Sequence, residues 1–322
     1  MYFTIGGRRV QSGLYRVSYV GSEPTAPVSM EPTPNAALQT RHTLEAFHGR
    51  LDLAAIDAAW PFLSDEDRFI RFAARTAIEH QPIQQWSDRA LNEPGPAKRV
   101  TALLALARAA GDCPQHRESG TAEVDAAMRQ KLLESLLAID SSSLDRTFRM
   151  SLVRTIQIVL NRFGMPNDSM QRELARKLDP LFPAKTPEEN WLLCETLAYL
   201  ESPSVASKAI ALIESVPTQE EQMQYARSIR MLKAGWTPQL RESYFEWFLK
   251  AANYRGGASF GKFIEFIRND SVASLSEDAK ASMAELLARK PDKKSVLENL
   301  GEVFAGRESK QWTLDELSLI HI

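Results

Sequence analysis

Residues 65–79, DEDRFIRFAARTAIE, place apolar side chains at two adjacent positions in every helical turn. This spacing predicts an α-helix whose wide apolar stripe packs on more than one neighbouring helix. Three arginines of the stretch, Arg68, Arg71 and Arg75, are three and four residues apart and therefore share one face. Two interpretations of this basic stripe are a binding surface and contacts by which the chain packs on itself. The second is favoured, because Asp67 lies four residues before Arg71 and Glu79 four residues after Arg75, within reach of helical ion pairs, whereas Arg68 has no assigned partner.

Similar helical patterns continue along most of the chain. The predicted helices span residues 38–48, 51–60, 65–79, 83–92, 96–110, 124–138, 143–163, 168–180, 187–200, 204–215, 219–233, 238–253, 259–268, 277–289, 293–304 and 313–318. They form pairs with short connections that recur about every 30–45 residues, the period of helical solenoids. One pair cannot bury its wide apolar face, whereas stacked pairs form a continuous core. The predicted fold is therefore all-α.

Capping residues mark where several helices begin and end. A Ser or Thr followed three positions later by an acidic residue predicts a capped start at four places: Ser64/Asp67, Thr186/Glu189, Thr218/Glu221 and Thr313/Glu316. Gly164 and Gly235 are predicted to end helices, because glycine adopts the left-handed conformation common after a helix.

The N-terminus differs from the helical remainder. Residues 1–5 and 14–20 form two β-like runs, and Tyr15, Val17 and Tyr19 alternate with polar residues as in a strand. Four prolines then interrupt residues 21–36. The predicted organisation is a hairpin at 1–20, a Pro-rich linker at 21–36, a helical repeat domain at 37–312 and the start of a further linker at 313–322.

Composition excludes several classes of protein. The 322 residues are 44% hydrophobic and 25% charged with a net charge of -2, which predicts a folded chain that does not bind nucleic acid, since that requires a cationic excess. No apolar run reaches the roughly 18 residues of a membrane helix, and residues 1–13 lack the apolar core of a signal peptide. Cys113 and Cys194 are too few for a disulfide scaffold.

Two motifs resemble cofactor sites but are incomplete. GGASFGK, Gly256 to Lys262, has the glycine spacing of a phosphate-binding loop, but Phe263 stands where Ser or Thr would bind magnesium and no strand precedes it. A tight turn is the preferred interpretation. CPQH, Cys113 to His116, lacks the second cysteine of a haem attachment motif. The remaining histidines, His42, His48, His80 and His321, are scattered singly, so no metal site is predicted.

No catalytic residue is predicted either. No serine lies in a G-x-S-x-G motif and no cysteine neighbours a base. The pairs Glu188/Glu189 and Glu220/Glu221 are at helix starts, where the helix dipole favours acidic groups. Helical spacing predicts that one aromatic group packs in the core, with an exposed docking patch as the alternative; its members are Tyr244, Phe245, Trp247, Phe248, Tyr254, Phe260, Phe263 and Phe266.

Several stretches resemble one family. Within residues 65–79, Asp67, Ile70, Arg71 and the Ala73–Ala74 pair resemble the second helix of a HEAT repeat, in which such an Asp and Arg link neighbouring repeats. MYFTIGGRRVQSGLYRVSYVG resembles the closing strands of a β-propeller of the sugar-dehydrogenase-like kind. Four further stretches resemble the helical region that follows such a propeller: RFIRFAARTAIE, PTQEEQMQYARSIRMLKAGWT, YFEWFLKAANYRGGASFGKFI and QWTLDEL.

The family comprises large exported proteins of planctomycetes and related bacteria. They join a propeller, a HEAT-like region and a C-terminal cytochrome c domain with a C-x-x-C-H haem site. The resemblance implies that this chain is a degenerate HEAT-like α-solenoid, with a residual hairpin from a propeller, and that haem c belongs only to a domain beyond residues 313–322. The last residues, SLIHI, are interpreted as foreign, translated adapter sequence.

Two functions are expected from this resemblance and from the missing catalytic groups. The first is a non-catalytic scaffold that docks the propeller and cytochrome c domains of an exported, periplasmic redox protein. The second is a stand-alone module that binds a protein or peptide partner through a polar, charged groove. No residue is assigned a catalytic, cofactor-binding or metal-binding role, and an unrecognised enzyme site would require convergent titratable groups in one pocket.

Overall fold

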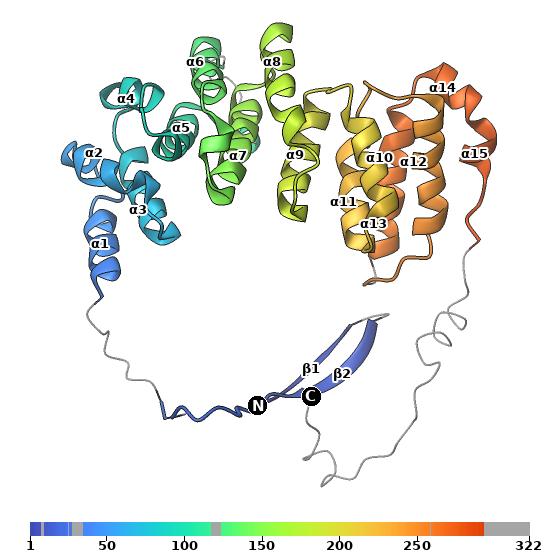
Figure 1. Ribbon diagram of the computed structural model, residues 1–322, viewed down its shortest axis with the longest axis horizontal. Coiled ribbons are helices and arrows are strands. Elements are labelled where there is room, and N and C mark those ends of the chain that lie inside the picture. The colour runs from blue at the N-terminus through green and yellow to red at the C-terminus, as the bar shows by residue number, and fades with distance from the viewer. Residues whose placement is uncertain (8–9, 25, 28–34, 117–123, 258, 293–322) are drawn as a thin grey trace. The chain divides into compact units, whose positions relative to one another are not determined.

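The computed structural model describes residues 1–7, 10–24, 26–27, 35–116, 124–257 and 259–292 (Figure 1). Within these ranges the chain is all-α, with fifteen α-helices and one two-stranded hairpin, which confirms the predicted class. The chain divides into two compact units. The N-terminal helical unit is Met30–Val205, and the C-terminal helical unit is Ala206–Ile322 grouped with Met1–Ser29.

The predicted hairpin is present. Strand β1 (Tyr2–Gly7) pairs antiparallel with β2 (Val10–Arg16), with an irregularity between Ile5 and Gly7. The rings of Phe3 and Tyr15 stack across the pair with centroids 5.3 Å apart. The second strand ends at Arg16, earlier than the β-like run that extends to residue 20.

The first helix of the N-terminal helical unit starts at the end of the Pro-rich segment. Asn35 caps the first helix, because its Oδ1 accepts hydrogen bonds from the backbone N–H groups of Ala37 and Leu38 at 2.8 and 3.4 Å. The helices of this unit are α1 (Ala36–Glu45), α2 (Ala54–Ala59), α3 (Arg68–Glu79), α4 (Ser87–Leu91), α5 (Pro96–Ala110), α6 (Ala126–Leu137), α7 (Arg146–Phe163), α8 (Asp168–Leu178) and α9 (Pro187–Tyr199).

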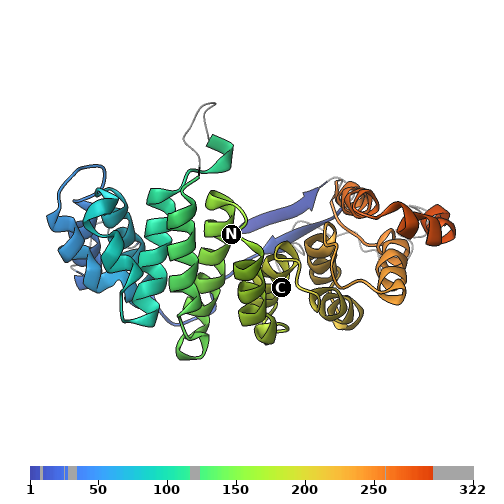
Figure 2. The same cartoon turned by 90° about the horizontal axis from the view of Figure 1, so that it is seen from above.

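These helices pack in two rows. In one row α1 contacts α3, α3 contacts α5, α5 contacts α7 and α7 contacts α9. In the other, α4 contacts α6 and α6 contacts α8, and the rows meet where α4 packs on α5, α6 on α7 and α8 on α9. Figure 2 shows the helices of this unit lying side by side. Fully buried leucines and isoleucines fill the space between the rows, including Leu103, Leu106, Leu132 and Ile156.

Helix α3 contains residues 68–79 of the stretch DEDRFIRFAARTAIE. Its apolar stripe is buried at Ile70 and Ile78 and at the alanines between them, as the spacing predicts. Phe69 and Phe72 are instead 53% and 58% exposed. The cap is Asp67, whose Oδ1 accepts from the Phe69 N–H at 2.7 Å. The predicted Ser64 cap is wrong, since Ser64 ends a preceding 3₁₀ helix that starts at Trp60.

Other predicted helix ends are confirmed or corrected. Thr218 Oγ1 accepts from the Glu221 N–H at 3.3 Å, and Gly164 follows α7 with φ of 75°, as predicted. Thr186 is at the predicted N-cap position of α9, but its side chain accepts from no helix N–H group; its hydroxyl instead donates to Glu189 Oε2 at 2.9 Å. Gly235 has φ of 74° but does not end α11, which stops six residues earlier. The predicted helices 293–304 and 313–318, and the Thr313/Glu316 cap, lie outside the described residues.

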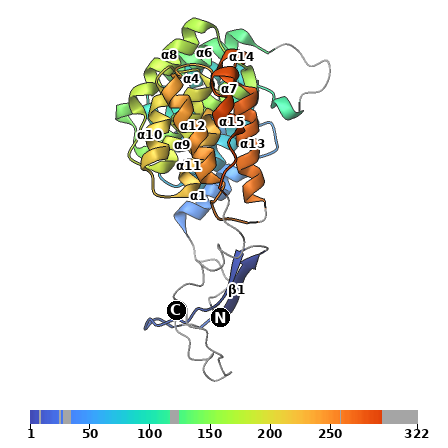
Figure 3. The ribbon, with the colours of Figure 1, turned by 90° about the vertical axis from the view of Figure 1, so that its right-hand side faces the viewer.

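The C-terminal helical unit is built on α12. After α10 (Val205–Ser215), which spans the unit boundary, its helices are α11 (Gln219–Ile229), α12 (Pro238–Ala251), α13 (Phe260–Ala273), α14 (Glu277–Ser282) and α15 (Ala284–Ala288). Helix α12 contacts α13 and α15, and α11 contacts α13 (Figure 3). Four aromatic residues of α12 are buried in this core: Tyr244, Phe245, Trp247 and Phe248.

Candidate functional site

A groove of about 350 Å³ lies along three helices of one row, α3, α5 and α7. Five arginines line it, namely Arg68, Arg71, Arg75, Arg108 and Arg154. Their neighbours in the wall are the aromatic Phe72 and Phe148, aliphatic side chains and two hydroxyls, and none of these described lining residues is acidic. We call this feature the arginine groove. The basic stripe of residues 65–79 is one of its walls.

Arg71 joins α3 to α7 without a carboxylate. Its Nη1 donates to the backbone carbonyls of Asp65 and Glu66, the latter at 3.0 Å. Its guanidinium carbon lies 5.2 Å from the centre of the Phe148 ring, a cation–π contact with α7. The predicted partner, Asp67, instead caps the helix. The expected link to a neighbouring helix is therefore present, but its chemistry differs.

Arg75 joins α3 to α5 through a shared carboxylate. Glu79 Oε1 accepts from Arg75 Nη1 at 2.9 Å, the predicted pair, and from Arg108 Nε at 2.9 Å. Burial lowers the pKa of Arg75; the Glu79 carboxylate opposes this shift and the Arg108 cation adds to it. Two cations thus share one anion at this end of the groove.

The other two arginines are exposed and face no carboxylate partner among the described residues. Arg68, left unassigned by the sequence analysis, lies with its guanidinium carbon 4.6 Å from the Phe69 ring centre. Arg154 Nη1 donates to the neutral Gln157 Oε1 at 2.8 Å. The side chains lining the groove therefore carry five positive charges, of which Glu79 offsets one. Such a site suits an extended anionic ligand, because arginine binds carboxylates through two parallel hydrogen bonds.

The incomplete motifs form no site among the described residues. Lys262 and Gly261 lie inside α13, and the Phe260 ring packs so closely on Gly256 that a Cβ there would approach it within 2.5 Å. Within the described ranges no three His, Cys, Asp or Glu side chains are grouped to hold a metal. His48 is used in packing, with Nε2 2.9 Å from the Ala73 carbonyl. His321 lies outside the described residues.

The prediction that the aromatic group of residues 244–266 packs in the core is confirmed for four of its side chains and wrong for two. The four buried aromatic side chains of α12 confirm it, whereas Phe263 and Phe266 on α13 are 55% and 60% exposed. The acidic pair of α9 also does more than the helix dipole explains. Glu188 pairs with Arg146 at 2.7 Å and Glu189 with Arg149 at 3.2 Å, so both tie α9 to α7.

Comparison of the sequence with protein-family models and with curated proteins found no match. Over the described residues, every helix is too short or too polar to cross a membrane.

Proposed function

We propose that this chain is a non-catalytic helical-repeat scaffold, a HEAT-like α-solenoid, that docks an acidic segment of a protein in the arginine groove. Support for the repeat architecture comes from the N-terminal helical unit, where each helix of a row packs on the next-but-one helix of the chain. Such nearest-neighbour packing is the basis of solenoid stability.

The charge of the groove carries the proposal. Three successive helices of one row each contribute at least one arginine to the same hollow. Adjacent helices pack about 8–10 Å apart, so three of them span about 16–20 Å, or five to six residues of extended peptide. A segment rich in Asp and Glu would meet Arg68 and Arg154 at the exposed positions, while Phe72 offers an apolar contact. A polar, charged groove is the feature that the sequence analysis expected of a binding module.

The family resemblance supports a particular context for this scaffold. In it, the chain lies between a propeller and a haem c domain of an exported, periplasmic redox protein, and the acidic segment belongs to one of those domains. A stand-alone binding module is the alternative. Flanking coding sequence with a propeller upstream and a C-x-x-C-H motif downstream would favour the first context, and cross-linking to a separate protein would favour the second.

Peptide binding by the full chain tests the proposal. A labelled peptide of about eight residues, rich in Asp and Glu around one Phe, would be compared by fluorescence anisotropy with its Asn/Gln counterpart. The double variant Arg68→Gln/Arg154→Gln should weaken binding of the acidic peptide about 2- to 30-fold, from two exposed charge pairs. Raising the ionic strength should weaken it further, because salt screens exposed charges.

The matched control is Arg176→Gln, which removes an exposed arginine from α8 in the other row. It should leave the affinity unchanged. Equal binding of the acidic and neutral peptides, or an undiminished affinity in the double variant, would contradict the proposal. So would tighter binding of a single-stranded oligonucleotide of equal charge, since that outcome would make the groove a nucleic-acid site.

A further inference from the structure

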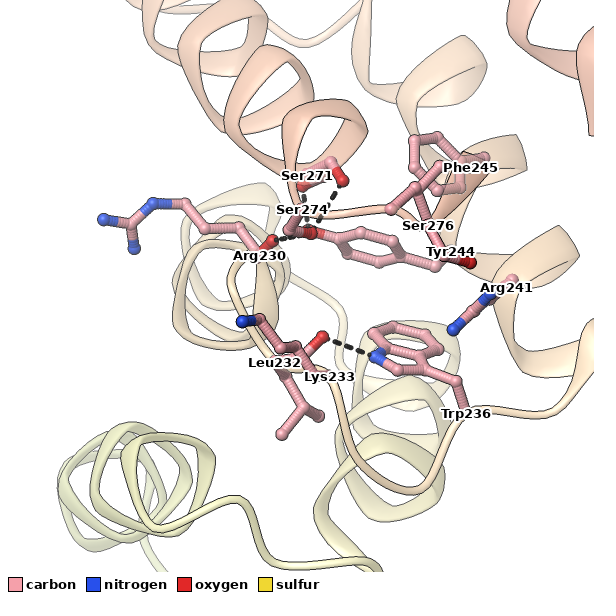
Figure 4. A pocket seen from close by; sticks show the side chains of 11 residues that line it. Arg230, Leu232, Lys233, Trp236, Arg241, Tyr244, Phe245, Ser271, Ser274 and Ser276 are labelled. Carbon is pink, nitrogen blue, oxygen red and sulfur yellow. Dashed lines mark hydrogen bonds between the residues drawn. The ribbon is translucent and has the colours of Figure 1, made fainter. Parts of the chain in front are cut away.

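A second hollow, also of about 350 Å³, lies within the C-terminal helical unit (Figure 4). It is formed by the turn after α11, the first turns of α12 and the end of α13. Its walls combine the aromatic rings of Trp236, Tyr244 and Phe245 with hydroxyls and cations. We call it the Trp236 pocket. Nothing in the docking role proposed above uses it.

Most polar groups of the Trp236 pocket are held by the fold itself. The Tyr244 hydroxyl donates to the Ala226 carbonyl at 2.8 Å and lies 2.8 Å from Ser271 Oγ. The Trp236 indole N–H donates to the Leu232 carbonyl at 2.9 Å. Ser274 Oγ donates to the Arg230 carbonyl at 3.0 Å. These bonds fix the walls of the pocket and the orientation of the indole ring (Figure 4).

Arg241 is different. Its Nε is closed off from solvent and has no hydrogen-bond partner among the described residues. Its guanidinium points toward Trp236 from the first turn of α12 (Figure 4). A buried N–H group without an acceptor is unfavourable, and such groups are rare in folded proteins. Arg241 thus lines the pocket as a cation whose Nε–H has no acceptor among the described residues.

The neighbouring charges do not neutralise Arg241. Arg230 extends away from the aromatic rings (Figure 4), and its Nε forms an ion pair with Asp270 Oδ2 at 2.9 Å. The Asp270 carboxylate is thus engaged by another arginine, and the described lining of the pocket contains no acidic side chain. An anion is the ligand that this balance favours.

We propose that the Trp236 pocket binds a carboxylate carried on an aromatic or other flat apolar body. Because its Nε is closed off from solvent, Arg241 donates two parallel hydrogen bonds to the carboxylate through its two Nη groups. The apolar body lies against the indole of Trp236 and the ring of Phe245, because pockets of this size are lined mainly by aromatic side chains with a few fixed polar groups. A small aromatic acid and the last residue of a peptide ending in an aromatic side chain share this chemistry.

Calorimetric titration of the full chain tests the proposal with phenylacetate, the neutral phenylacetamide, and a short peptide ending in Phe as free acid or amide. Phenylacetate should bind at least about tenfold more tightly than phenylacetamide, and Arg241→Gln should weaken phenylacetate binding at least about tenfold, the usual size of a charged hydrogen bond. Arg241→Lys should fall between, because it keeps the charge and loses the planar fork. Tighter binding of the free-acid peptide than of phenylacetate would identify the C-terminus of a peptide as the ligand. Tighter binding of phenylacetate would identify a small aromatic acid as the ligand.

The control variant is Lys250→Gln, which removes an exposed cation from the same helix, α12. It should bind phenylacetate like the unmodified chain. Far-UV circular dichroism reports whether Arg241→Gln folds, and the comparison of acid with amide on the unmodified chain does not depend on that variant. Equal affinity for phenylacetate and phenylacetamide, absence of binding at millimolar concentration, or equal losses in the Arg241 and Lys250 variants would overturn the proposal.

Discussion

Glu79→Gln is the substitution that most directly tests how α3 is held against α5. The Glu79 carboxylate accepts hydrogen bonds from two arginines of different helices, Arg75 and Arg108, both at 2.9 Å. Glutamine keeps the length of the side chain and one acceptor oxygen, but it removes the negative charge. The two guanidinium groups then repel each other, and Arg75 is left as a cation with little water around it.

The magnitude follows from how much of each side chain is exposed. Side chains of Arg75 and Glu79 are 12% and 15% exposed, whereas that of Arg108 is 40% exposed. Removing one member of a fully buried pair costs about 3–5 kcal/mol, and an exposed pair contributes less than about 1 kcal/mol. The pair on α3 lies closer to the buried limit. We expect Glu79→Gln to reduce the free energy of local unfolding by about 1.5–3 kcal/mol.

Hydrogen exchange measured by mass spectrometry is the suitable assay, because long helical arrays do not unfold as one two-state unit. Amides of α3 and α5 should exchange about 10- to 150-fold faster in the variant, which is the same free energy expressed as a ratio of rates. Glu173→Gln on α8 is the matched control, since its distance to Arg176 is 3.9 Å and its side chain is 50% exposed. Exchange in α3 that changes less than about twofold would refute the reasoning.

Three further predictions follow from single residues. Gly164→Ala should lower the free energy of unfolding by about 1–3 kcal/mol, because the φ of 75° and ψ of -179° at this position suit only glycine. Gly261→Ala, inside α13 with open space where a Cβ would lie, should change the free energy of unfolding little or raise it by up to about 1 kcal/mol. Chemical denaturation compares the two variants. Tyr244→Phe should cost about 1–2 kcal/mol in the same assay, because it removes the donor to the Ala226 carbonyl in a buried site. Hydrogen bonds from Ser142 lower the pKa of Asp140 in the folded chain. Ionised Asp140 therefore stabilises the fold above its unfolded pKa of about 3.9, and this contribution is lost as the pH falls through the lower folded pKa, so the stability difference between the unmodified chain and Asp140→Asn should shrink below about pH 4.

The helices were predictable because their signals are local. Helix α5 spans residues 96–110, as the apolar spacing predicts, and α7 ends at residue 163, directly before the predicted stop at Gly164. Two helix predictions are wrong because part of the segment forms the tighter 3₁₀ helix. Predicted helix 51–60 is a short α2 that continues as a 3₁₀ helix, with Pro61 at its start, and predicted helix 83–92 begins as a 3₁₀ turn. Sequence period alone does not separate these two helix types.

The groove could be predicted only in part. Its α3 wall was visible as an arginine stripe, but Arg108 and Arg154 enter from helices far along the chain, and no sequence spacing connects them to α3. The partners of Arg71 could not be predicted from the sequence either. Asp67 has the right spacing for a helical ion pair, yet its carboxylate is used for the backbone N–H of Phe69, because a capping position competes with that pair.

This competition explains why the groove is positive in a chain whose net charge is -2. Backbone carbonyls and the Phe148 ring hold Arg71 in place, and neither cancels its charge. A cation that is fixed by neutral groups loses little conformational freedom when an anion arrives, so the fold prepares the site in advance. The same contacts make Arg71 and Arg75 poor choices for testing binding, since replacing them would also loosen α3. Arg68 and Arg154 contribute charge without joining helices, and a loss of affinity in their double variant would therefore report on docking alone.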